Sequence, residues 1–165
     1  MTAIDLKTRF ADPGATLSRC CASRGWVSAM MAAGPFSDRQ ALFDAASRIW
    51  WQLDTKDWLE AFAGHPKIGD LNHLREKFAA TAHLSSREQA GVTEASEETL
   101  SQLAAGNQVY EARFGFIFIV CATGKSAAEM LALLKDRLKH EPEDELRIAA
   151  GEQLKITLLR LEQCL

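Results

Sequence analysis

Apolar side chains recur every three or four residues along most of this chain, which is the period of one face of an α-helix. The pattern is clearest after Ser37, a suitable N-cap, where six apolar residues follow at that spacing: Leu42, Ala45, Ala46, Ile49, Trp50 and Leu53. Strand-like segments do not alternate with helical ones, which disfavours a doubly wound α/β fold. The sequence therefore predicts an all-α fold, a helical bundle.

Turn and capping residues divide this pattern into separate helices. The apolar run from Leu17 to Ala33 is stopped by Gly34-Pro35. Asp54 or Thr55 can cap a short helix, which Gly64 and Pro66 end. Further helices are expected over residues 71–82 and, as one or two helices, over residues 85–114.

The last third of the chain contains one segment of a different kind. Residues 116–122 are continuously apolar and rich in aromatic and β-branched side chains, so they form either a buried strand-like segment or a buried helix. Ser126 and Glu129 then form a capping box, and Glu141-Pro142 opens the last helix. The expected core stripe of that helix is Leu146, Ala149, Ala150, Leu154, Leu158 and Leu161.

Composition limits the classes of protein that this chain can belong to. Its 165 residues suggest a single domain, 1–165, and its formal net charge of −3 gives no footprint for nucleic acid. No run of about 18 apolar residues is present, so no membrane span is expected. The first residues lack the pattern of a signal peptide, and we expect a cytoplasmic location with four reduced, mostly buried cysteines.

His65, directly before Pro66, is the first candidate for chemistry. Proline disfavours the α region for the residue that precedes it, so His65 should lie in extended or turn geometry at a helix exit. A histidine there can titrate near neutral pH and point into a cleft. The alternative interpretation is a hydrogen-bonded structural histidine.

Two further polar groups are equally ambiguous. Ser85 and Glu88 have the spacing of an N-terminal capping box, but Glu88 and Gln89 can also present a carboxylate and an amide to a polar heterocycle. Arg160 is either a last-turn arginine favoured by the helix dipole or a guanidinium fork for a carboxylate.

No metal site is expected. His73 and His83 are ten residues apart and form neither an i, i+4 pair nor an HExxH set. A metal-dependent helical hydrolase that uses His65, His73, His83 and an acidic residue is kept as a rival hypothesis, to be tested by metal analysis.

Taken in order along the chain, these motifs resemble the 2-oxo-4-hydroxy-4-carboxy-5-ureidoimidazoline (OHCU) decarboxylase family. The resemblance covers nearly the whole chain. It is carried by Cys20-Cys21 with Trp26, residues 57–62, His65-Pro66-Lys67-Ile68-Gly69, residues 85–91, residues 110–119, Arg137-Leu138, and the segments from Glu145 to Leu161. Gly34 and His140 depart from the family pattern, which bears on local packing or dimer contacts.

The resemblance implies a cofactor-free carboxy-lyase of urate breakdown in an all-helical fold, usually a homodimer, that converts OHCU to (S)-allantoin and carbon dioxide. It implies that His65 and Glu88 are catalytic. It also implies substrate contacts from Pro66, Ser85, Gln89, Phe118, Ile119, Val120, Cys121, Ala122 and Arg160. The alternative is a non-catalytic helical module that binds a purine-like ligand.

Overall fold

The computed structural model describes residues 2–66 and 97–165, which form two compact units. The first unit holds residues up to His65 together with 150–165, and the second holds Pro66 and residues 97–149. The described residues contain eight helices and no β-strand, apart from one isolated bridge between Ile4 and Phe36. The predicted all-α fold is therefore confirmed.

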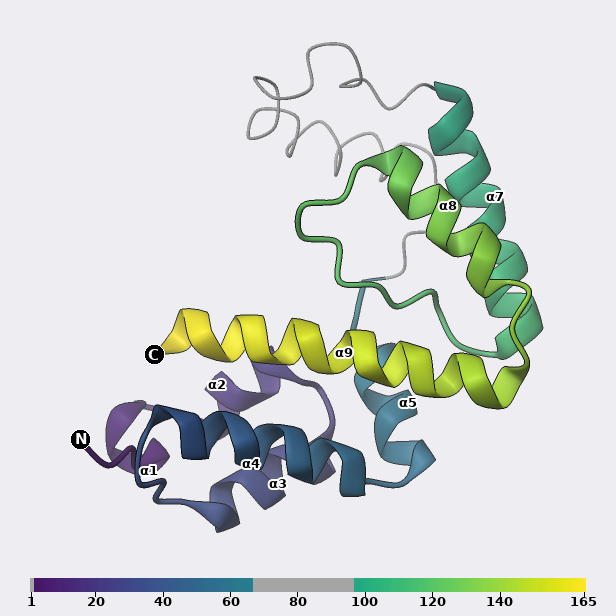
Figure 1. Cartoon of the computed structure of the whole chain (residues 1–165). Helices are drawn as coiled ribbons and strands as arrows, with labels where there is room; N and C mark the ends of the chain where they lie inside the picture. Colours follow the sequence, from purple (N-terminus) through teal and green to yellow (C-terminus); the bar gives the residue numbers. More distant parts are fainter. Residues whose placement is uncertain (1, 67–96) are drawn as a thin grey trace, which may run out of the picture. The chain divides into compact units, whose positions relative to one another are not determined.

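The first unit is built around α3 (Arg24–Ala33), which packs against α2 (Pro13–Cys20), α4 (Arg39–Gln52) and α5 (Thr55–Ala63) (Figure 1). A short helix, α1 (Leu6–Arg9), precedes them. Tryptophans fill the core and find acceptors for their N–H groups. Trp26 Nε1 donates to Ala46 O at 3.1 Å, and Trp50 Nε1 donates to Ala150 O at 2.9 Å. The large apolar rings are thus buried without leaving a polar atom unpaired.

Residues 17–33 form two helices where the sequence indicated one apolar-rich run. Cys21 has extended backbone angles at the end of α2, and Ser23 starts α3 by accepting a hydrogen bond from Trp26 N at 3.2 Å. A serine side chain that satisfies a free helix amide favours such a restart. The break places Cys21 and Ser23, both buried, in a connecting segment.

The predicted bounds of α4 and α5 hold to within one residue. The N-cap of α4 is Asp38 instead of Ser37, because the Asp38 carboxylate accepts from Ala41 N at 2.8 Å. Asp54 is the N-cap of α5 and Gly64 is its C-cap, as expected.

The second unit is centred on α7 (Glu97–Phe114) and α8 (Ala127–Arg137), which lie side by side (Figure 1). Their shared core contains Leu100, Leu103, Tyr110, Ala127, Met130 and Leu134. Ser126 is the N-cap of α8, as predicted, since its Oγ accepts from Glu129 N at 3.1 Å. The Glu129 carboxylate meets the Ser126 hydroxyl at 3.3 Å. Residues 117–122 form neither a helix nor a strand, which excludes the buried helix that the sequence had left open.

The last helix, α9 (Pro142–Cys164), buries a different stripe from the predicted one. Ala149, Ala150 and Leu161 are buried as expected, but Leu146, Leu154 and Leu158 are only half-buried. Their places on the buried face are taken by three polar residues: Glu145, Gln153 and Thr157. This correction has a physical reason: each polar side chain has a hydrogen-bonding partner, which removes most of the cost of its burial. None of the described helices is long and apolar enough to cross a membrane.

Candidate functional site

His65 lies in the turn that follows α5, as its position before proline predicted. Its backbone N–H donates to Phe62 O at 3.2 Å, and Pro66 after it is exposed. Gly64 makes this turn possible because the helix end closely approaches Ala22. A Cβ atom on Gly64 would lie only 2.4 Å from the Cβ of Ala22. The turn is therefore held against the segment that connects α2 and α3.

The imidazole of His65 is attached to the buried face of α9. Its Nε2 atom lies 2.5 Å from Oε1 of Gln153, whose Nε2 donates to Thr157 Oγ1 at 3.0 Å. Both α9 side chains are only 1% exposed. Thr157 in turn hydrogen-bonds the thiol of Cys21. A continuous polar chain thus runs through the core from the α2–α3 connection to a half-buried histidine.

Arg160 lies on the same side of α9, seven residues beyond Gln153, which is about 10 Å along the axis. Its guanidinium is exposed and makes a long contact, 3.4 Å, with Arg19 O. Arg160 also lowers the pKa of the Cys20 and Cys21 thiols, although burial outweighs this effect and raises these values to about 12 and about 11. Two predicted site residues therefore lie along one face of α9: His65, which contacts Gln153, and Arg160, which is part of the helix.

The four cysteines are free thiols, and three of them are buried. Cys20 Sγ lies 3.9 Å from Cys164 Sγ within the first unit. The raised pKa values of Cys20 and Cys21 keep both thiols protonated at neutral pH, so neither has the character of a nucleophile.

The predicted contact segment Phe118–Ala122 belongs to the second unit, and its backbone is held by one buried and one half-buried cation. Arg137 Nη1 donates to Ile119 O at 2.6 Å, and its guanidinium carbon lies 4.6 Å from the centre of the Phe118 ring. Lys125 Nζ donates to Cys121 O at 2.8 Å. Ile119 and Cys121 are buried, and the alternate residues Phe118, Val120 and Ala122 are half-buried.

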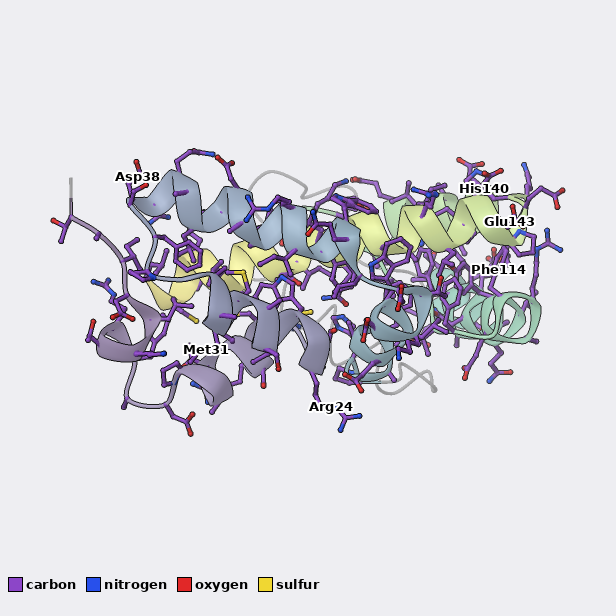
Figure 2. The ribbon with its side chains drawn as sticks, turned by 90° about the horizontal axis from the view of Figure 1, so that it is seen from below. Arg24, Met31, Asp38, Phe114, His140 and Glu143 are labelled. Carbon is purple, nitrogen blue, oxygen red and sulfur yellow. The ribbon has the colours of Figure 1, made fainter. Side chains whose placement is uncertain are left out.

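Arg137 is itself fixed by a buried acid. Its Nε donates to Glu145 Oε1 at 2.6 Å, and the same carboxylate accepts from the hydroxyl of Tyr110 at 2.6 Å. His140 Nδ1 lies 3.0 Å from the other carboxylate oxygen. Figure 2 shows His140 beside the start of α9. His140, one of the departures from the family pattern, is thus a partner of the acid that orients Arg137.

Three predicted site residues, Ser85, Glu88 and Gln89, lie outside the described residues, as do His73 and His83. Within the described ranges, no three His, Cys, Asp or Glu side chains gather as ligands for a metal ion. No role was assigned from the sequence to the side chains that support the predicted ones: Gln153, Thr157, Tyr110, Arg137 and Glu145. Tyr110, Arg137 and Glu145 stood only among the motifs that carry the family resemblance. The available signal was the spacing of Glu145, Gln153 and Thr157, which are eight and four residues apart and so share one face of α9.

Comparison with protein families gives one match across almost the whole chain. A family model described as OHCU decarboxylase matches residues 8–162. The uric acid degradation bifunctional protein TTL of Arabidopsis thaliana is 41% identical over 145 residues, which are 86% of this chain and 44% of that protein. This chain therefore spans less than half the length of that bifunctional relative. An OHCU decarboxylase of Haloferax volcanii is 27% identical over 129 residues, 78% of this chain and 74% of that protein.

Solved structures include a similar fold. A crystal structure of OHCU decarboxylase in the presence of (S)-allantoin superposes with a TM-score of 0.73 and 39% sequence identity. The match covers 88% of this chain and 94% of the other. A structure of (S)-allantoin synthase, 21% identical, shares the fold with a TM-score of 0.67 over 98% of this chain and 54% of that one.

Proposed function

This chain belongs to the OHCU decarboxylase family, and from that premise we propose that it converts OHCU to (S)-allantoin and carbon dioxide. A relative with 39% identity has been crystallised in the presence of (S)-allantoin, which supports the proposed product. The observation that carries the proposal is the position of His65. A half-buried imidazole at a helix exit, held by a buried amide 2.5 Å away, is suited to moving a proton at neutral pH.

In this reaction the protein has to move protons, whereas the substrate itself accepts the electrons. When the bond to the carboxylate carbon breaks, its electron pair passes into the unsaturated ring system of the substrate, and a proton is then returned to one face. No pyridoxal or metal is needed for this step, and we propose that the enzyme works without a cofactor. His65 would activate the substrate hydroxyl or return the proton, and Glu88 would fix its orientation and charge.

The remaining proposed roles concern orientation. Arg160 would hold a carboxylate or polar ring oxygen with its exposed guanidinium. Ser85, Gln89 and Pro66 would contact the ureido group or the ring edge, and the backbone of Phe118–Ala122 would fix the ring. Enforced geometry can supply several kcal/mol, and protonation on one face requires it.

The test is the chirality of the product. OHCU decays spontaneously to racemic allantoin, so substrate loss alone is a poor measurement. Freshly made OHCU should give optically active allantoin with the wild-type chain, followed by circular dichroism, and His65→Ala should abolish the signal while the far-ultraviolet spectrum stays unchanged. Glu162→Gln, at an exposed position of α9, is the matched control and should retain the wild-type signal.

Three results would overturn these assignments. Formation of (S)-allantoin by His65→Ala at close to the wild-type rate would remove the proton role from His65. A folded wild-type chain that binds a purine-like ligand but leaves the product racemic would instead favour a non-catalytic binding module. Loss of activity on dialysis against a chelator, restored by one metal ion, would favour the metal-dependent hydrolase.

We also propose that the chain folds as one domain and forms a homodimer in the cytoplasm. The continuous family match over residues 8–162 supports one domain, and the family resemblance supports the dimer. Sedimentation equilibrium should give twice the mass of the 18.2 kDa chain, and thermal unfolding should show one cooperative transition. A monomer at micromolar concentration, or two separate transitions, would contradict these expectations.

A further inference from the structure

Two buried polar side chains of α9 are linked directly to His65. Gln153 and Thr157 are each 1% exposed. They lie on the buried face of α9, for which the sequence predicted a stripe of leucines and alanines. Burying an amide or a hydroxyl without a hydrogen-bonding partner is costly. Both side chains avoid this cost through one chain of hydrogen bonds, and that chain ends at the imidazole of His65.

The contact with Thr157 sets which end of the Gln153 amide faces the histidine. Gln153 Nε2 donates to Thr157 Oγ1, 3.0 Å away, so the amide oxygen Oε1 faces the imidazole. A flipped amide would place its oxygen, which cannot donate, opposite Thr157 Oγ1 and an N–H group opposite the histidine.

The amide then fixes the histidine. Gln153 Oε1 is only an acceptor, so the atom that faces it at 2.5 Å, His65 Nε2, must carry a proton. The hydrogen bond at one ring nitrogen commonly sets the tautomer of a functional histidine in this way.

We propose that Gln153 is a positioning residue, whose buried amide oxygen keeps a proton on His65 Nε2 and fixes the orientation of the imidazole ring for decarboxylation. Thr157 supports it by keeping the amide from turning over. This inference rests on the proposed function for its catalytic meaning. The tautomer itself can be measured without any substrate.

The first test is the tautomer of His65 in the folded wild-type chain. Long-range proton–nitrogen correlation spectra of protein labelled with ¹⁵N-histidine separate the two tautomers, and a spectrum of His65→Gln identifies the His65 signals among the four histidines. The expected result is a protonated Nε2. An Nε2 atom without a proton in the wild-type chain would overturn the proposal without any further variant.

The second test removes the acceptor. Gln153→Met keeps an unbranched side chain of similar size but cannot accept from the imidazole. We expect a mixture of tautomers, a kcat about 10- to 100-fold lower and a KM close to that of the wild type. Gln163→Met, at an exposed position of the same helix, should change none of these values.

The third test uses the supporting hydroxyl. Thr157→Val leaves the Gln153 amide without its acceptor, so the amide can turn and offer an N–H to the imidazole. We expect part of the His65 population to move to the Nδ1–H form, and Thr157→Ser should restore the wild-type spectrum and kcat. If Gln153→Met does not fold, the wild-type spectrum and this pair decide the question.

These outcomes are separable from failure of the proposed function. A wild-type chain that leaves allantoin racemic contradicts the decarboxylase assignment, whatever the tautomer. An active wild-type chain whose tautomer and kcat survive both Gln153→Met and Thr157→Val contradicts the positioning role alone.

Discussion

Arg137 and Glu145 form an ion pair, 2.6 Å from Nε to Oε1, in which the two side chains are only 6% and 0% exposed. Water cannot replace either partner at such a depth. The pair is also the support of residues 118–122, because Arg137 donates to Ile119 O. Its integrity should therefore affect both stability and the shape of the proposed contact segment.

Glu145→Gln should lower the free energy of unfolding by about 3–5 kcal/mol, because it leaves the Arg137 charge buried without a counter-charge. Urea unfolding at pH 7 measures this loss. Glu162→Gln breaks the exposed pair between Arg39 and Glu162, and it should cost less than about 1 kcal/mol. Equal losses for the two variants would show that burial does not set the strength of the Arg137–Glu145 pair.

Gly64→Ala should reduce both stability and activity. The new Cβ would lie 2.4 Å from the Cβ of Ala22, so the turn that carries His65 must move, at a cost of about 1–3 kcal/mol. Gly151→Ala is the control, because its Cβ would meet only Trp51 Cη2 at 3.9 Å, and we expect it to stabilise α9 by about 0.5–1 kcal/mol. Thermal denaturation and the chirality assay measure the two effects. An unchanged melting temperature for Gly64→Ala would contradict the close approach.

Stability should fall as the pH rises above 9. Burial raises the pKa of Cys21 from its ordinary 9.0 to about 11, so between these values the unfolded chain releases a proton that the folded chain retains. The stabilisation is complete below pH 9 and is lost as the pH approaches 11. For Cys21 alone the loss is about 2 kcal/mol. Burial also raises the pKa of Cys20 and of the Tyr110 hydroxyl, which adds to the same trend.

Urea unfolding under reducing conditions at pH 8 and pH 10.5 checks this expectation. Cys21→Ala should flatten the dependence on pH, since it removes one of the groups that titrate. A variant with the same slope as the wild type would show that the Cys21 thiol is not protected by folding.

Ser126→Ala should destabilise α8 by about 1 kcal/mol, because the hydroxyl accepts from the Glu129 backbone amide at the helix start. Ser101→Ala, at an exposed position within α7, lacks this role and should leave the melting temperature unchanged or slightly higher. Differential scanning calorimetry separates the two. A cost as small as that of the control would remove the capping role from Ser126.

Local signals explain which parts of the fold could be predicted. Asp54 and Gly64 bound α5, and Ser126 with Glu129 starts α8, because a cap is decided by residues within one turn. The break between α2 and α3 also had a local signal, because Ser23 is a favourable N-cap residue. An apolar run alone could not show that residues 117–122 are not helical, since their backbone is held by a distant side chain, Arg137, which donates to Ile119 O.

The support of the candidate site depended on long-range partners. Gln153 is buried because it meets His65, 88 residues earlier, and apolar periodicity carries no information about such a pairing. His65 itself could be proposed because Pro66 sets its local geometry. Its link with Arg160 was implied by the family resemblance, and the structure places the two along one face of α9.

The polar residues on the buried face of α9 also matter for anyone who redesigns this chain. A procedure that idealises helix cores would replace Gln153 and Thr157 with leucine or valine. Exchanging buried polar groups for apolar ones of similar volume is often neutral or stabilising. Such a variant is therefore expected to keep its expression and heat resistance. It would also have lost the residues that select one protonation form of the His65 ring, so thermostability and turnover must be selected together in this helix.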